Sequence, residues 1–227
     1  MRAPDWSFAA DLLFPPRCPF CGQVIRHGEQ TCPTCAQLKP SAIRRELPQP
    51  GGEGLLCFAA YPYTGKARKA VLRMKFEGEA PIAGFLGRQL AQSLQAELSQ
   101  SFLPDVVTVV PMTKLHRLRR GYNQSERIAR AAAKALGLPY QSLLCKRKHN
   151  RVQHKLSEKE RFQNVQGVFA ALPQAGGLRI LLVDDIVTTG ATLAACQTAL
   201  FSAGAAEVLC AAAAMTLPSN EAGKNKH

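Results

Sequence analysis

One short stretch, residues 180–192, constrains the fold more than any other part of the chain. It reads ILLVDDIVTTGAT, in which an apolar run leads into Asp184 and Asp185, a turn follows, and a helix begins at Ala191. Open sheets of parallel strands bind their ligands where the strands end, at the carboxyl edge of the sheet. The stretch therefore predicts a strand over residues 179–183 of an α/β sheet, with an acidic pair at the ligand-binding edge.

Strand and helix patterns alternate along most of the remaining chain. Apolar runs typical of strands lie at 55–61, 106–110, 143–145, 165–170 and 207–213. Apolar residues at helical spacing mark 64–76, 82–98, 122–136 and 191–202. Apolar central strands that alternate with helices are typical of a parallel sheet with helices on both faces. We predict this α/β fold for residues 55–217.

The remaining segments are shorter. A helix over 7–14 and a small cysteine module are predicted within residues 1–40, a linker rich in proline and glycine over 41–54, and a disordered tail over 218–227. No segment is apolar over the roughly 20 residues that a membrane span requires. Acidic residues interrupt the apolar stretch at the N-terminus, which argues against a signal peptide. We therefore expect a cytoplasmic protein.

Half of the eight cysteines form two Cys-x-x-Cys pairs, and these are Cys18, Cys21, Cys32 and Cys35. Two such pairs joined by a short hairpin can surround one tetrahedral zinc ion, which is the closed arrangement of a structural zinc site. Two disulfides are the alternative, but a reducing compartment disfavours them. The other four cysteines are predicted to be small core residues, and these are Cys57, Cys145, Cys196 and Cys210.

The net charge of +13 is concentrated in one part of the chain. Residues 113–163 carry fourteen basic side chains against three acidic ones. A region of this kind indicates a polyanionic partner, which could be a polyphosphate, a nucleic acid, or both. A solvated basic face that serves only solubility is the alternative, although such surfaces usually mix the two signs.

The turn after the acidic pair offers donors for an anion. Its backbone N–H groups and the following helix N-terminus can cradle a phosphate, Thr188, Thr189 and Thr192 add hydroxyls, and Gly190 permits close backbone approach. Two carboxylates would repel a bare anion, but they suit a ligand with hydroxyls beside its phosphate and a divalent cation. Ribose 5-phosphate carrying a Mg²⁺-bound pyrophosphate fits this description. An ordinary helix N-terminus with incidental acids is the alternative.

The stretch 180–192 resembles the phosphoribosyl diphosphate (PRPP) signature of type I phosphoribosyltransferases. Other motifs are similar to the ComF/GntX family: Val110-Pro111, 119–124, Gln153, Leu156-Ser157, Arg161, Asn164-Val165, Gly167, Phe169, and the four cysteines that follow Phe14-Pro15-Pro16. This resemblance spans residues 12–217. It implies a type I phosphoribosyltransferase-like core with a zinc ribbon. It also implies a role in natural competence, with incoming single-stranded DNA and proteins of the DNA-uptake machinery as partners.

The resemblance also implies roles for individual residues. The acidic pair of the superfamily holds the ribose 2- and 3-hydroxyls, a role that would fall to Asp184 and Asp185. The turn that holds the 5-phosphate would comprise Val187, Thr188, Thr189, Gly190, Ala191 and Thr192. Pyrophosphate is expected at residues 112–121, and a basic loop over 146–155 would close over the site. The charge on the leaving group would be stabilised by Mg²⁺, Arg119, Arg120 and one of Lys146, Arg147 or Arg151.

Three functions remain open on this basis. The first is a DNA-uptake protein that binds Mg–PRPP and also binds single-stranded DNA through Lys114, Arg117, Arg120, Lys148, Arg151 and Lys155. The second is an active phosphoribosyltransferase with an unidentified nucleobase or other acceptor. The third is a regulator or assembly factor that binds PRPP without turnover. Thr188 stands where purine-salvage members carry a carboxylate, which argues against purine transfer. Asn123 and Gln124 are either amides of an acceptor site or polar residues at a helix N-terminus.

Overall fold

The centre of the molecule is a five-stranded sheet with the order β1-β2-β7-β6-β3. The computed structural model describes residues 15–47, 54–100, 102–112, 122–147 and 167–218. Four neighbouring strands are mutually parallel, namely β2 (Leu55–Pro62), β7 (Glu207–Met215), β6 (Arg179–Val187) and β3 (Val106–Val109). The predicted parallel sheet is therefore confirmed.

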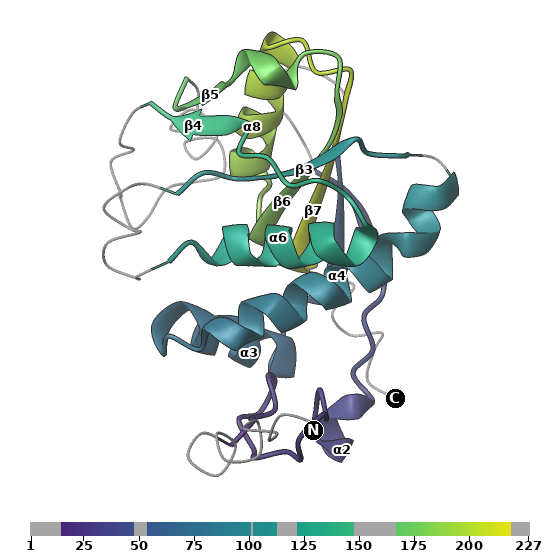
Figure 1. Cartoon of the computed structure of the whole chain (residues 1–227), viewed down its shortest axis with the longest axis vertical. Helices are drawn as coiled ribbons and strands as arrows, with labels where there is room; N and C mark the ends of the chain where they lie inside the picture. The colour runs from purple at the N-terminus through teal and green to yellow at the C-terminus, as the bar shows by residue number, and fades with distance from the viewer. Residues whose placement is uncertain (1–14, 48–53, 101, 113–121, 148–166, 219–227) are drawn as a thin grey trace, which may run out of the picture.

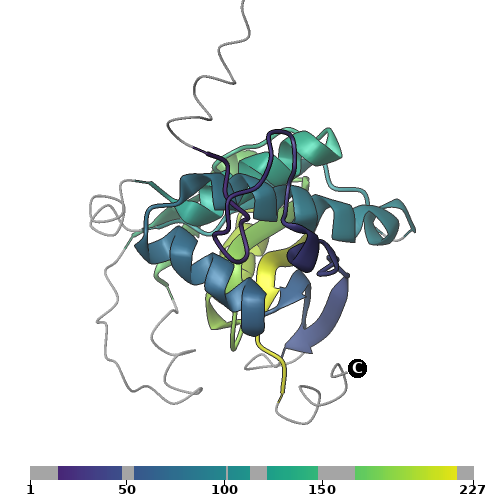
Figure 2. The same cartoon turned by 90° about the horizontal axis from the view of Figure 1, so that it is seen from below.

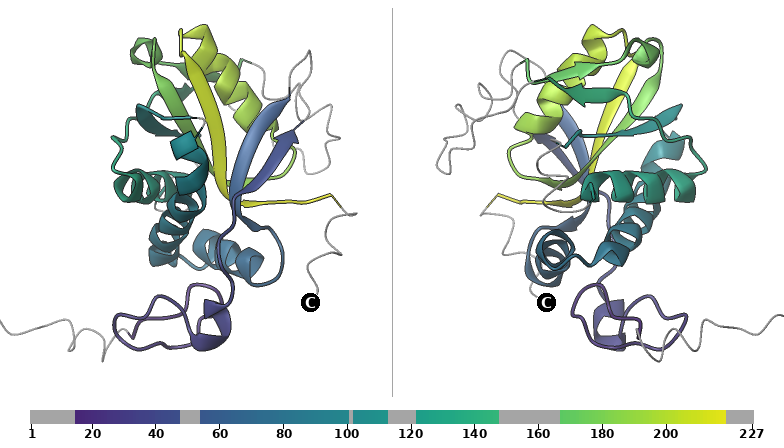
Figure 3. Two further views of the ribbon diagram at one scale, coloured as in Figure 1. Left: turned by 90° about the vertical axis from the view of Figure 1, so that its right-hand side faces the viewer. Right: turned by 60° about the vertical axis from the view of Figure 1, so that its left-hand side comes forward.

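Helices cover both faces of this sheet (Figure 1 and Figure 3). One face carries α3 (Gly65–Phe76), α4 (Ala80–Gln100) and α6 (Gln124–Leu136), and the other carries α8 (Ala191–Ser202). The alternation along β6 explains the two layers, because Leu181 and Val183 pack with the first group of helices. Ile180 and Leu182, on the other face of the strand, pack with α8. The predicted α/β layering is confirmed.

A second, smaller sheet lies against α8. It consists of β4 (Leu144–Lys146) and β5 (Phe169–Ala171), which pair antiparallel and are followed by a short 3₁₀ helix, η1 (Pro173–Ala175). Strands were expected over 143–145 and 165–170, but they form this separate pair rather than extending the parallel sheet. Cys145 was predicted to be buried, and it is exposed because the short strand turns only Leu144 toward the core. The other three predicted core cysteines are buried.

The segment predicted to be a linker, 41–54, contains the edge strand β1 (Ile43–Leu47). This strand pairs antiparallel with β2, from Ile43 opposite Ala59 to Leu47 opposite Leu55. Leu47, the last residue of the strand, is 1% exposed and packs in the core on the α8 side of the sheet, and its burial favours the pairing. The linker prediction was therefore wrong for these residues. The whole of the predicted helix at 7–14, residues 48–53 and residues 219–227 of the predicted tail lie outside the described residues.

The cysteine module lies below α3 and α4 and includes the one-turn helix α2 (Pro33–Ala36) (Figure 1 and Figure 2). Phe20 is fully buried and makes edge-to-face contacts with Tyr61 of β2 at 5.5 Å and Phe85 of α4 at 5.3 Å between ring centroids. The module therefore shares one hydrophobic core with the helices on that face of the sheet. Within the described part of the chain, no helix is both long enough and apolar enough to span a bilayer.

Candidate functional site

The acidic pair lies within β6, beyond the end of its neighbour β3. The β3–β6 pairing stops at Val109 opposite Val183, whereas the β6–β7 pairing continues to Val187 opposite Met215. The strand was expected to end before Asp184, but β7 extends the ladder past both acids. Because β3 stops earlier, one edge of β6 is left without a strand partner at the acidic pair among the described residues.

Asp184 is held by two hydrogen bonds to the same carboxylate oxygen. The Ser125 hydroxyl, in the first turn of α6, donates to Asp184 Oδ1 at 3.0 Å, and the backbone N–H of Asp185 donates to that atom at 2.8 Å. Burial, followed by the negative charge of Asp185, raises the pKa of the Asp184 carboxyl to about 7. The two hydrogen bonds and the charge of Lys75 oppose this shift. A carboxyl group poised in this way can accept hydrogen bonds from ligand hydroxyls once it is ionised.

Asp185 is paired with a cation from a distant part of the sequence. Lys75 Nζ, in the last turn of α3, donates to Asp185 Oδ1 at 2.9 Å, and the two side chains are 17% and 11% exposed. Breaking one partner of such a buried pair is costly because it leaves an uncompensated charge. Sequence reasoning missed both Lys75 and Ser125 as site residues, because they come near the acids only through tertiary packing.

The turn after β6 leads directly into the N-terminus of α8. Gly190 is the N-cap residue with φ +80°, and a Cβ atom there would lie 2.6 Å from Leu47 Cδ1. Because glycine has no side chain, the N-cap residue itself cannot cap the helix. The Thr189 hydroxyl accepts a long hydrogen bond, 3.5 Å, from the N–H of Ala191. Thr188 is exposed. The N-cap residue of α8 therefore offers no side chain to its first N–H groups, and N–H groups at the start of a helix bind anions.

The N-terminus of α6 contains an amide that lacks partners. Asn123 is the N-cap, and its side-chain oxygen accepts from the N–H of Glu126 at 3.3 Å, so its helix-terminus interpretation is confirmed. Gln124 is fully buried, and neither its Nε2 nor its Oε1 has a hydrogen-bond partner among the described residues. Leaving a buried amide unsatisfied costs about 1–3 kcal/mol per group. The acceptor-site interpretation of Gln124 therefore stays open.

The basic residues predicted for the site are only partly described. Lys146 Nζ lies 5.5 Å from the centroid of the Phe169 ring, and burial lowers the pKa of Lys146. Arg147 lines a cavity of about 320 Å³ between β5 and α8. Within the described residues, neither cation forms an ion pair with Asp184 or Asp185. The remaining predicted basic residues lie outside the described ranges, and they are Lys114, Arg117, Arg119, Arg120, Lys148, Arg151 and Lys155.

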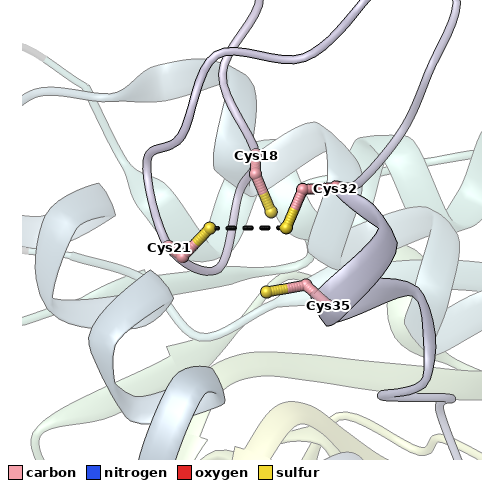
Figure 4. A group of neighbouring side chains, drawn as sticks. All are labelled: Cys18, Cys21, Cys32 and Cys35. Carbon is pink, nitrogen blue, oxygen red and sulfur yellow. Dashed lines mark hydrogen bonds between the residues drawn. The ribbon is translucent and has the colours of Figure 1, made fainter.

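The four predicted zinc ligands converge (Figure 4). The sulfur atoms of Cys18, Cys21, Cys32 and Cys35 all lie within 4.8 Å of one another, and those of Cys21 and Cys32 are 3.6 Å apart. Four sulfurs at zinc-bonding distance are separated by about 3.8 Å, so the set fits a tetrahedral zinc ion. Burial opposes ionisation of Cys18, but hydrogen bonds from nearby backbone N–H groups outweigh it and lower the pKa of that thiol to about 7. With all four positions taken by protein, zinc here would be structural.

Comparison with known proteins agrees with this arrangement. Residues 9–46 match the double zinc ribbon domain, and residues 123–226 match the phosphoribosyl transferase domain. DNA utilization protein YhgH of Salmonella typhimurium is 33% identical over 84% of this chain and 80% of its own length. The chain belongs to the ComF/GntX family. Competence protein F of Haemophilus influenzae, another member, is 28% identical over 78% of this chain and 75% of its own length.

Two of the solved structures that match this chain do so at TM-scores below 0.5. Glutamine PRPP amidotransferase from B. subtilis matches with 27% identity and a TM-score of 0.41, over 68% of this chain and 29% of that one. Adenine phosphoribosyltransferase from Saccharomyces cerevisiae matches with 16% identity and a TM-score of 0.38, over 77% of this chain and 83% of that one. In this ComF/GntX protein, Lys75 lies between the two matched domains and belongs to neither matched segment.

Proposed function

We propose that this ComF/GntX protein binds PRPP together with Mg²⁺ at the carboxyl end of β6, and that this binding serves the use of external DNA. The observation that carries the proposal is that Asp184 and Asp185 lie on the part of β6 that extends beyond β3, and that the turn after β6 leads into the N-terminus of α8, where Gly190 provides no side-chain cap. The names of the relatives, a DNA utilization protein and a competence protein, support the cellular context. The reducing cytoplasm, where we place the protein, would keep the four thiolates available to zinc.

Each part of the site would have a separate task. The two carboxylates would accept hydrogen bonds from the ribose 2- and 3-hydroxyls, and such charge-assisted bonds are stronger than neutral ones. The N–H groups at the start of α8, with Thr189 and Thr192, would hold the 5-phosphate. Bound Mg²⁺ would neutralise part of the pyrophosphate charge. Through their hydrogen bonds to the ribose hydroxyls, Asp184 and Asp185 would orient the sugar rather than transfer protons.

Titration calorimetry with Mg–PRPP tests this proposal. The double variant Asp184→Asn/Asp185→Asn is expected to lower the affinity at least about 100-fold, because two hydrogen bonds to charged acceptors are lost. The matched control is Asp105→Asn/Glu207→Gln, which removes the same charge at the amino ends of β3 and β7. The control should bind like the wild type. Equal affinity in the wild type and the acidic-pair variant would reject the site.

We also propose that residues 113–163 bind single-stranded DNA, since most of the positive charge lies there. Each neutralised phosphate releases counterions, and six contacts give a slope of about −4 for log affinity against log salt concentration. We expect Lys148→Ala/Arg151→Ala/Lys155→Ala to reduce that slope by about 2 in fluorescence-anisotropy titrations. Arg68→Ala/Lys69→Ala/Arg88→Ala removes an equal charge from exposed positions on α3 and α4 and should leave the slope unchanged. A wild-type affinity that does not depend on salt would contradict charge-driven binding.

An active phosphoribosyltransferase remains the second candidate, and one observation favours it. The buried amide of Gln124 has no partner among the described residues, and it is next in sequence to Ser125, which holds Asp184. An acceptor with both a donor and an acceptor group would satisfy it. Release of pyrophosphate from Mg–PRPP in the presence of candidate acceptors distinguishes this enzyme from a protein that only binds PRPP.

A further inference from the structure

The last turn of α3 contacts three separate parts of the molecule through three consecutive residues. Arg73 binds the backbone of the cysteine module, the carbonyl of Met74 accepts a hydrogen bond from Tyr122, and Lys75 binds Asp185. A single turn of helix therefore connects the zinc ligands to the acidic pair. Neither matched domain includes this turn, and the sequence pattern predicted only a helix over residues 64–76.

Arg73 makes the contact with the module. Its Nη1 donates to the carbonyl oxygens of Cys18 at 3.2 Å and Pro19 at 3.1 Å. Its Nε and Nη2 donate to the two carboxylate oxygens of Glu79, a forked pairing that fixes the plane of the guanidinium. Gly22 closes over the same group, since a Cβ atom there would lie 3.3 Å from Arg73 Cζ. The side chain is 13% exposed, so these contacts are shielded from water.

Lys75 makes the contact with the acidic pair, and Tyr122 makes a second connection. The Tyr122 hydroxyl donates to the carbonyl of Met74 at 2.8 Å. Tyr122 immediately precedes Asn123, the N-cap residue of α6. The first turn of α6 in turn places Ser125 against Asp184 at 3.0 Å. Both carboxylates are therefore oriented by groups that are attached to the last turn of α3, one directly and one through α6.

We propose that Lys75 is a positioning residue for Asp185, and that the zinc ribbon holds Lys75 in place through Arg73. Side chains that bind a ligand are held in position by the residues that contact them, and loss of those residues weakens binding. With zinc bound by the four cysteines, the carbonyls of Cys18 and Pro19 would be held in one geometry, and Arg73, which donates to both, would hold the helix turn in place. The consequence for PRPP rests on the proposed function, whereas the connection between ribbon and acidic pair does not.

The first test needs no ligand. Hydrogen exchange by mass spectrometry is measured over residues 183–187 in the zinc-loaded full chain. Lys75→Met and Arg73→Met are expected to speed exchange there about tenfold or more, since each removes one step of the connection. The matched control is Lys66→Met, which removes another hydrogen bond from α3 to the module, from Lys66 Nζ to the carbonyl of Thr34 at 3.1 Å. It should leave exchange at these residues unchanged.

The second test uses Mg–PRPP. Lys75→Met and Arg73→Met should both weaken binding about tenfold, Lys66→Met should not, and Lys75→Arg should recover most of the loss. If Arg73→Met fails to fold, Arg73→Lys, which keeps the charge but cannot form the fork, takes its place and should show the same effects more weakly. The inference would be overturned if hydrogen exchange over residues 183–187 in either the Arg73 or the Lys75 variant were as slow as in the wild type. A wild type that does not bind Mg–PRPP would reject the proposed function, and the exchange data would then decide the positioning role alone.

Discussion

Cys35→Ser is expected to release the zinc ion and to lower the melting temperature by on the order of 10 °C. The ribbon contributes few residues to the core, and a module of this size depends on its metal for its fold. Cys35 is 1% exposed and its sulfur lies within 4.8 Å of those of the other three ligands. A serine hydroxyl at this position stays protonated at neutral pH, so it would not replace the thiolate as a zinc ligand. Loss of the ribbon would also uncover the apolar surface that Phe20 now covers on Tyr61 and Phe85.

Metal content by native mass spectrometry and differential scanning calorimetry measure these two effects on the same samples. Cys145→Ser is the matched control, because Cys145 is an exposed thiol on β4 and belongs to no ligand set among the described residues. It should retain one zinc ion per chain and the wild-type melting temperature. A Cys35→Ser protein with a full zinc content and an unchanged melting temperature would show that the four cysteines do not hold a structural ion.

Local sequence patterns were sufficient for the elements whose ends are set by local chemistry. Helix α6 was predicted over 122–136 and is observed over Gln124–Leu136, because Asn123 caps its start and Gly137, with φ +70°, ends it. The end of β6 was not predictable in this way. The residues after Asp184 look like a turn, but β7 continues the pairing to Val187, so a strand partner rather than local composition decides where β6 stops.

Some residues of the candidate site could be found from local sequence, and others could not. Asp184 and Asp185 could be found in the sequence because the strand, the acids and the turn are contiguous there. Lys75 is 110 residues from Asp185, and Ser125 is 59 residues from Asp184, so only the packing of α3 and α6 on the sheet brings them together. The one available signal was a basic residue in the last turn of a helix, and this is also expected from the helix dipole alone.

Burial of the acidic pair has a consequence for stability. A carboxyl group whose pKa rises on folding takes up a proton when the chain folds at intermediate pH, and this weakens the folded state as the pH increases. Functional sites commonly keep such unfavourable groups because the ligand needs them. The folded protein without ligand should therefore carry a penalty at Asp184 that the unfolded chain does not.

Asp184→Asn is accordingly expected to stabilise the protein without ligand, and to do so only above acidic pH. The pKa of Asp184 is about 7 in the folded chain, against about 4 when unfolded. The penalty is absent below pH 4, grows between pH 4 and 7, and then stays constant at a few kcal/mol. Asparagine avoids it and can keep both existing hydrogen bonds, since Ser125 and the Asp185 N–H donate to the same oxygen, Oδ1.

Thermal unfolding of wild type and variant from pH 4 to pH 8, without Mg²⁺ or PRPP, measures the effect. The two melting curves should nearly coincide at pH 4, and the variant should melt on the order of 10 °C higher at pH 8. Asp105→Asn is the control, and its expected effect has the opposite sign. Hydrogen bonds from Arg179 lower the pKa of the Asp105 carboxyl, so the ionised carboxylate stabilises the folded state at neutral pH. Replacing that carboxylate with asparagine should therefore lower the melting temperature. If Asp184→Asn melted below the wild type at pH 8, the carboxylate would be stabilising in the unliganded protein. The raised pKa of Asp184 would then be wrong, and so would the conclusion that Asp184 destabilises the folded protein in the absence of ligand.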